Sequence, residues 1–132
     1  MTPYVTLGAR DAAEGARFYD AVLAAIGWSA HVTFDGWSAY SAGGTGEGFT
    51  FWCCTPFDGQ PASAGNGTMV SFPARSRAEV DAFHAAALRE GGRDEGAPGP
   101  REAYGPHWYS AYMRDPTGNK IAVYLNWPEA SA

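Results

Sequence analysis

The amino-acid sequence predicts an α+β fold made of two copies of a strand–helix–strands unit. The first observation is an internal repeat: residues 4–28 laid over residues 69–93, an offset of 65 residues without gaps, share nine identities in 25 positions. The second is that both copies carry a helix-start pattern followed by an apolar stripe at helical spacing. The third is a hairpin signature over residues 104–125. Because strand, cap, stripe and stop keep one register, duplication explains the repeat better than a chance likeness of two Ala-rich helices.

The first copy begins with a short strand over residues 3–8, and a helix follows over residues 12–26. Asp11 and Glu14 form a capping-box pattern at the start of that helix, and Gly27 supplies a natural stop after it. Aromatic and β-branched residues beyond this stop favour further strands. We expect three of them, over residues 29–34, 37–41 and 48–54.

The second copy repeats this plan after a loop rich in Gly, Pro and Ser, residues 56–67. Ser76 and Glu79 repeat the capping box, and the pair at residues 91–92 repeats the glycine stop. The segment 94–106 is rich in Gly and Pro, so we expect it to replace a regular strand at least in part and to form a lid over a cleft. The apolar stripe expected for the second helix is Val80, Phe83, Ala87 and Leu88.

A tight turn at residues 115–119, Asp-Pro-Thr-Gly-Asn, sets the register of the last hairpin. Pairing outward from it places Tyr112 opposite Ala122 and Ser110 opposite Tyr124, on a face that mixes aromatic and polar groups and could line a cavity. The other face is fully apolar and is expected to pack against a helix; its residues are Met113, Ile121, Val123 and Leu125.

Composition narrows the class of protein. A chain of 132 residues with 45% hydrophobic residues is typical of one compact globular domain. The net charge of -5 argues against nucleic acid or an anionic membrane as a partner. No apolar run reaches the roughly 18 residues of a membrane span, and no secretory signal is present, so we expect a cytoplasmic protein. Cys53 and Cys54 are adjacent with no cation beside them, so both are expected to be reduced and buried rather than catalytic.

The motif Arg-Asp-Pro-Thr-Gly-Asn-Lys-Ile, residues 114–121, resembles the last hairpin of the glyoxalase/bleomycin resistance protein/dioxygenase superfamily, also called the vicinal oxygen chelate superfamily. Residues 4–8 and 96–101 are similar to its glyoxalase-like branch, and the likeness spans nearly the whole chain. This superfamily supports many reactions on one scaffold, so the resemblance implies a fold more strongly than an activity.

The resemblance implies a single glyoxalase-like domain over residues 1–132. It would contain two βαβββ modules, over about residues 1–60 and about residues 68–127, that form a curved eight-stranded mixed sheet around a cleft. The helices would cover the outer face of the sheet. Chains of this kind usually pair, so the resemblance also implies a homodimer.

Metal-using relatives place ligands at four strand positions that face the cleft, typically His, Gln or Glu. The resemblance puts Tyr4, Trp52, Met69 and Ala122 at these positions. Indole and methyl groups ligate nothing, a thioether suits soft copper, and a phenol is an occasional ligand for iron. A divalent metal needs three or four nitrogen or oxygen ligands at one point. We therefore expect no metal and no other cofactor.

Strand alternation directs several large aromatic side chains into the same cleft, which favours a small flat or apolar ligand. Arg101 could clamp a carboxylate, and His107, at the rim, could fix a polar end. His31 and His84 are interpreted as structural histidines, on the surface or partly buried. The residues predicted to bind the ligand are Tyr4, Trp52, Met69, Arg101, His107, Trp108, Tyr112, Ala122 and Tyr124.

Three functions fit these observations. The first is a metal-free protein that binds a small molecule without chemistry, as the bleomycin-resistance proteins do. The second is a glyoxalase-like lyase or isomerase, or a dioxygenase, and the missing ligands count against it. The third is a metal-free enzyme with Tyr4 and His107 as acid and base. It lacks a clear carboxylate partner for His107, for which Glu102 is the candidate.

Overall fold

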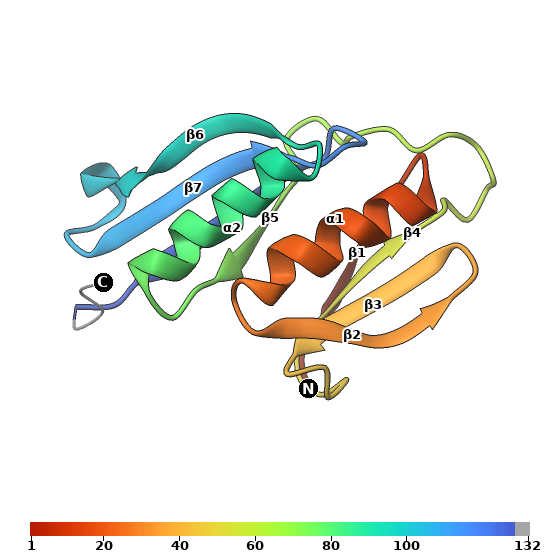
Figure 1. The fold of residues 1–132 in the computed structure, drawn as a ribbon, viewed down its shortest axis with the longest axis horizontal. Coiled ribbons are helices and arrows are strands. Elements are labelled where there is room, and N and C mark those ends of the chain that lie inside the picture. Colours follow the sequence, from red (N-terminus) through yellow and green to blue (C-terminus); the bar gives the residue numbers. More distant parts are fainter. Residues whose placement is uncertain (129–132) are drawn as a thin grey trace.

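The computed structural model describes residues 1–128 and contains two βαβββ modules, which follow one another along the chain (Figure 1). The first comprises β1 (Tyr4–Gly8), α1 (Ala12–Ala24), β2 (Trp28–Phe34), β3 (Trp37–Ala42) and β4 (Thr50–Cys54). The second comprises β5 (Met69–Pro73), α2 (Arg77–Arg89), β6 (Arg93–Pro100), the short 3-10 helix η1 (Glu102–Tyr104), β7 (Trp108–Arg114) and β8 (Lys120–Asn126).

Each module has its own four-stranded mixed sheet, with strand order β1-β4-β3-β2 in the first and β5-β8-β7-β6 in the second. The pairs β1–β4 and β5–β8 are parallel, and the other neighbours are antiparallel. The predicted α+β fold with two βαβββ modules is confirmed. Strand hydrogen bonding stays within each module, so the eight strands form two sheets of four rather than one continuous sheet.

Side-chain caps define where both helices begin. The side chain of Asp11 accepts a hydrogen bond from the backbone of Glu14 at 3.1 Å, and Ser76 accepts one from the backbone of Glu79 at 3.2 Å. The predicted helix starts are therefore confirmed. The chain leaves α1 through Gly27, whose φ of 79° is easy only for glycine. Neither helix in the described part of the chain is long and apolar enough to cross a membrane.

The two helices pack against each other in front of the sheets, and the apolar core runs through both modules (Figure 1). The ring of Phe72 on β5 lies 5.2 Å from that of Phe51 on β4 and 5.7 Å from that of Trp28 on β2, measured between centroids. Leu88 was predicted to join this core but is 43% exposed. The buried stripe of α2 is already complete without it, with Leu88 at its solvent margin, and consists of Val80, Phe83, His84, Ala86 and Ala87.

The segment predicted to be an irregular lid is mostly a strand. Residues 93–100 form β6, which pairs with β7 through two register shifts, one on each side of Gly96. Gly and Pro are tolerated here because β6 is an edge strand with bulges, where a missing donor or side chain costs little. Only the following residues, 101–107, lie outside the strands of the sheet.

The hairpin turn has the predicted register and also ties the modules together. Tyr112 pairs with Ala122, as expected from the turn. The side chain of Asn119 donates to the carbonyl of Gly8 at 2.8 Å, and the hydroxyl of Thr117 accepts from a backbone N–H of the first module at 3.0 Å. The last hairpin therefore fixes the position of β1 relative to the second module.

Candidate functional site

Each sheet has one face that packs against its helix and one helix-free face. Alternation along the strands decides on which of the two faces each side chain lies. Leu7 on β1 and Phe72 on β5 are buried toward the helices. On the opposite face Tyr4 is 68% exposed and Met69 is 44% exposed. The two helix-free faces are therefore where large side chains remain open to a ligand or partner.

The strand registers put the fourth and eighth strands in matching positions. Trp52 pairs with Thr6 in the first sheet, and Ala122 pairs with Ser71 in the second. Thr6 and Ser71 are themselves equivalent in the repeat, since they lie 65 positions apart. Trp52 and Ala122 therefore occupy corresponding places in the two modules.

Trp52 lies at the centre of an aromatic cluster on the first helix-free face. Its ring centroid is 6.4 Å from that of Tyr4, 6.2 Å from that of His31 and 6.0 Å from that of Trp37. The indole N–H donates to the hydroxyl of Thr50 at 3.2 Å, which fixes the ring. This cluster gives the first module a wall of aromatic edges.

His31 belongs to this cluster although the sequence analysis interpreted it as structural. β2 is irregular between Ala30 and Val32, next to His31. Nδ1 of His31 lies 3.0 Å from the hydroxyl of Ser41, and that hydroxyl accepts the backbone N–H of Gly46 at 2.8 Å. The buried serine therefore orients the imidazole ring.

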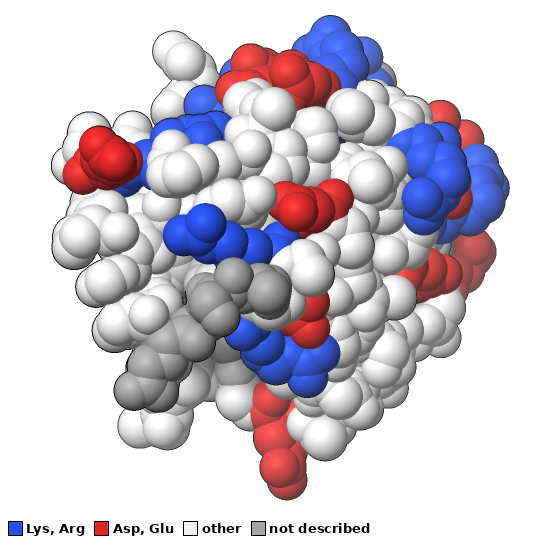
Figure 2. Space-filling model, turned by 60° about the vertical axis from the view of Figure 1, so that its left-hand side comes forward, with Lys and Arg blue, Asp and Glu red and all other residues white. Residues whose placement is uncertain are grey.

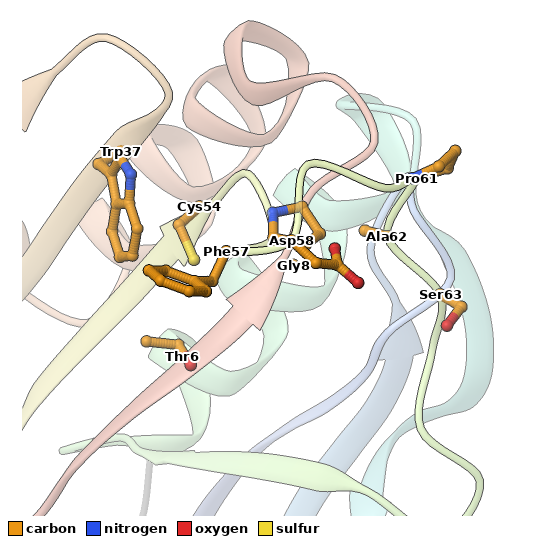
Figure 3. A pocket seen from close by; sticks show the side chains of 10 residues that line it. Thr6, Gly8, Trp37, Cys54, Phe57, Asp58, Pro61, Ala62 and Ser63 are labelled. Atoms are coloured by element: carbon orange, nitrogen blue, oxygen red, sulfur yellow. The ribbon is translucent and has the colours of Figure 1, made fainter.

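The strand and linker side chains beside this cluster surround a first hollow of about 350 Å³ (Figure 3). Thr6, Trp37 and Cys54 come from the sheet, and Phe57 and Asp58 come from the linker. Phe57 is fully exposed. Asp58 is the one charged residue among the described residues that line the hollow.

The two cysteines are free and buried, as predicted. Burial raises the pKa of Cys53 to about 12, and burial also raises the pKa of Cys54. A thiol must lose its proton to act as a nucleophile, so neither side chain is suited to covalent catalysis near neutral pH.

The second helix-free face carries a stacked aromatic pair. The rings of Trp108 and Tyr124 lie 5.1 Å apart with an interplanar angle of 16°, and Tyr104 meets Trp108 edge-on at 6.0 Å. Beside them is a second hollow of about 680 Å³. Its lining residues are Met69, Ala103, Tyr104, Trp108, Tyr112 and Lys120.

Two cations lie near the ring of Tyr112 in this second face. The ammonium nitrogen of Lys120 is 5.7 Å from the ring centroid, and the guanidinium carbon of Arg101 is 5.6 Å from it. Arg101 donates to the backbone carbonyls of Ala97 at 2.8 Å and Pro100 at 3.2 Å. The sequence analysis missed Lys120, which strand alternation could have found because it lies two residues before Ala122.

The molecular surface shows no extended patch of one charge on the face that Figure 2 presents. Lys and Arg side chains form small groups there, with Asp and Glu groups among them. A nucleic-acid surface would instead gather basic groups along one face.

No protein-family model and no curated protein matches the sequence. Among solved structures, a glyoxalase/bleomycin resistance protein from Albidiferax ferrireducens T118 shares 38% sequence identity, covers 92% of this chain and 95% of its own, and superposes with a TM-score of 0.82. This chain belongs to the glyoxalase/bleomycin resistance protein family.

More distant structures share the fold of this family member. A glyoxalase/bleomycin resistance protein/dioxygenase family enzyme from Burkholderia phytofirmans PsJN is 17% identical, with a TM-score of 0.69 over 94% of this chain and 97% of its own. Lactoylglutathione lyase from Agrobacterium tumefaciens is 21% identical, with a TM-score of 0.64 over 95% of this chain and 92% of its own. At such identities the likeness shows the fold alone.

The residues of this glyoxalase/bleomycin resistance family member do not fit the metal that relatives use. The four ligand positions hold Tyr4, Trp52, Met69 and Ala122, which offer one phenol oxygen and one thioether sulfur. Within residues 1–128, no group of three or more His, Cys, Asp or Glu side chains is placed to hold a metal ion.

The structure distributes the predicted ligand-binding residues of this family member over two places. Tyr4 and Trp52 lie on the first sheet. His107 is exposed between η1 and β7 and makes no hydrogen bond within the described part of the chain. Ala122 is 1% exposed, so it lies beneath the surface of its face. The predicted residues that gather around the second face are Met69, Arg101, Trp108, Tyr112 and Tyr124.

Within one chain the two hollows share no lining residue. The first is lined by the first module and the linker, and the second by the second module. The strands of the two sheets do not pair with one another in the described residues, and the modules meet through the two helices and through core contacts such as Phe72 with Phe51. The aromatic side chains that the sequence assigned to a single cleft are therefore divided between two modules within one chain.

Proposed function

We propose that this protein binds a small planar aromatic molecule, without a metal, in a cleft that a second copy of the chain completes. The observation that carries the proposal is the stacked pair of Trp108 and Tyr124 beside a hollow of about 680 Å³. Flat aromatic faces next to open volume favour a ligand that can stack on them or meet their edges.

The aromatic wall is fixed before any ligand arrives. The indole N–H of Trp108 donates to the hydroxyl of Ser110 at 3.2 Å, and that hydroxyl donates to the phenol oxygen of Tyr112 at 3.3 Å. Ser110, the middle member of this relay, is fully buried. Rings that are already oriented lose little conformational entropy on binding, which favours affinity.

A homodimer would complete the cleft. β1 and β5 each pair on one side only, so both present an open backbone edge, and Tyr4 and Met69 stand exposed beside those edges. A two-fold axis that sets β1 of one copy beside β5 of the other would cover both edges at once. It would also bring the first hollow of each copy toward the second hollow of its partner.

The residues favour binding over catalysis. The four metal-ligand positions supply no divalent site, which disfavours a metal-dependent lyase, isomerase or dioxygenase. In the described residues, no hydrogen bond joins Tyr4 to His107, and no carboxylate bonds the His107 ring. Acid–base catalysis requires an oriented donor and acceptor, so a ligand-sequestering role is the function these residues support best.

The test is a titration of the purified protein with planar aromatic molecules, followed by tryptophan fluorescence and thermal unfolding. A ligand at about 100 times its dissociation constant should quench fluorescence and add roughly 2.7 kcal/mol of stability. The Trp108→Leu variant should lose this response. Trp127→Leu is the matched control, because Trp127 is 60% exposed and does not line the second hollow. Equal binding by both variants, or stabilisation by small polar compounds alone, would contradict the proposal.

A further inference from the structure

We infer that the aromatic ligand carries a carboxylate, and that Lys120 is the residue that recognises it. The inference rests on the proposed aromatic cleft and specifies the chemical class of its ligand. Lys120 is the only lysine in the sequence. It lines the second hollow with Trp108 and Tyr112.

The register of β8 places Lys120 at the ligand. It pairs with Met69 on β5 and with Arg114 on β7, and residues 120, 122 and 124 share the helix-free face. Lys120 also lines an adjoining hollow of about 410 Å³, together with Met69 and Arg114. Lys120 therefore borders two open volumes, and its ammonium nitrogen lies 5.7 Å from the centroid of the Tyr112 ring.

No carboxylate of the described chain neutralises Lys120 by direct contact. The ion pairs in residues 1–128 are Arg75–Glu79 and Arg114–Glu95, and Asp94 also lies 2.8 Å from Nε2 of His84. Glu95 is the carboxylate that lies under the influence of Lys120, but it already accepts the Nε–H of Arg114 at 2.7 Å. The hydrogen bond from Arg114 lowers the pKa of Glu95, and the charges of Arg114, Lys120 and Arg93 add to this lowering.

Arg101 adds a second positive charge above the same ring. Its guanidinium donates to two backbone carbonyls, which hold it over Tyr112 without neutralising it. Glu102 is exposed and does not line the hollow. The described residues that line the second hollow include Lys120 but no Asp or Glu, so an anion placed there meets a cation and no like charge.

The first hollow is lined by a negative charge instead of a positive one, and this difference favours the second hollow as the site of the anion. Its one charged lining residue among those described is Asp58, an acid. A carboxylate near Asp58 would be repelled, whereas near Lys120 it gains a charge-assisted hydrogen bond beside an aromatic surface of low polarity. The stacked rings would hold the flat body of the ligand, and Lys120 its charged end.

The experiment compares one- and two-ring aromatic carboxylates with their carboxamides, for example naphthalene-2-carboxylate and naphthalene-2-carboxamide. The two have the same flat body and differ in charge. Wild-type protein should bind the carboxylate at least about tenfold more tightly, the range of one hydrogen bond to a charged group. Raising the salt concentration should lower the affinity for the carboxylate and leave the affinity for the carboxamide unchanged.

Three variants locate the effect. Lys120→Met should remove the preference for the carboxylate while keeping carboxamide affinity within about twofold. Lys120→Arg should retain the preference because the charge remains, and it guards against a mere packing defect. Arg89→Met is the matched control, since Arg89 lies in the last turn of α2, outside both hollows. It should behave as wild type.

The outcomes separate the two proposals. If both compounds bind equally and Lys120→Met changes neither, the aromatic cleft stands and the carboxylate assignment is overturned. If no member of the panel binds, the aromatic cleft fails and the assignment falls with it. Lys120 can also be followed directly, because reductive methylation labels one side-chain amine in this chain besides its N-terminus. The NMR signal of the labelled Lys120 amine should shift when the carboxylate is added and stay in place when the carboxamide is added.

Discussion

The phenol of Tyr19 on α1 donates a hydrogen bond to the carboxylate of Asp115 in the β7–β8 turn at 2.6 Å, across 96 residues of sequence. Both side chains are buried. The other oxygen of Asp115 accepts the three backbone N–H groups of residues 117–119 at 2.9–3.0 Å. One carboxylate therefore closes the turn and anchors the helix of the other module.

Removing this phenol should destabilise the fold. Tyr19→Phe keeps the ring and loses the hydrogen bond to a charged group, so we expect a loss of about 1.5–3 kcal/mol in the free energy of unfolding. Tyr109→Phe is the control, because Tyr109 donates to Asp81 at 2.7 Å in an exposed setting. There the loss should stay below about 1 kcal/mol. Urea unfolding measures both, and equal losses would show that the Tyr19–Asp115 contact contributes little across the modules.

Stability should fall in alkali. Burial raises the pKa of Cys53 from 9.0 to about 12, and burial together with Asp115 raises the pKa of Tyr19 well above 10.0. Above pH 9 the unfolded chain therefore binds fewer protons than the native protein, and the free energy of unfolding decreases as pH rises. Each such group contributes up to about 1.4 kcal/mol per pH unit. Cys53→Ala should show a shallower decline between pH 9 and 12 in denaturant titrations, and parallel slopes would refute this assignment.

The chain should form a homodimer at micromolar concentration. Light scattering should give twice the 14.0 kDa mass of the chain. Met69→Glu places a charge beside the open edge of β5 and should weaken the dimer more than about tenfold. Leu88→Glu is a matched control, since Leu88 is 43% exposed against 44% for Met69 but lies on α2. If the measured mass is that of one chain throughout the concentration range, a cleft completed by a second copy is ruled out.

Purified protein without a tag should carry no stoichiometric divalent metal, and a chelator should leave its melting temperature unchanged. Combining Tyr4→His, Met69→His and Ala122→Glu supplies three ligands at the positions that relatives use, so this variant should gain divalent-metal affinity. The same combination with Ala122→Gln lacks the carboxylate and should bind more weakly. Metal found in the parent protein, and lost when Met69 is replaced, would overturn this prediction.

The last hairpin could be predicted closely from sequence because turn chemistry and a period of two leave one register. The pairing of Tyr112 with Ala122 follows from the turn alone. Residues near irregularities were harder to predict. His31 lies beside an irregularity in β2 and contacts Trp52, and two register shifts let the Gly- and Pro-rich residues 93–100 form β6.

The separation of the two hollows could not be predicted either. Alternation tells which face of a strand a residue occupies, and says nothing about how two sheets sit relative to each other. That placement depends on packing between α1 and α2 and on distant contacts such as the ring of Phe72 against Phe51. Lys120 was missed for a simpler reason. The candidate residues on this face were chosen as metal ligands or aromatic groups, and a lysine is neither.

The alternation along β1, β4, β5 and β8 makes the protein a convenient framework for engineering. Leu7 and Phe72 maintain the core, while Tyr4 and Met69 on the same strands face outward. A library restricted to the outward positions could change what the surface recognises while leaving the interior intact. The duplicated architecture offers two such surfaces per chain, and each could be selected independently.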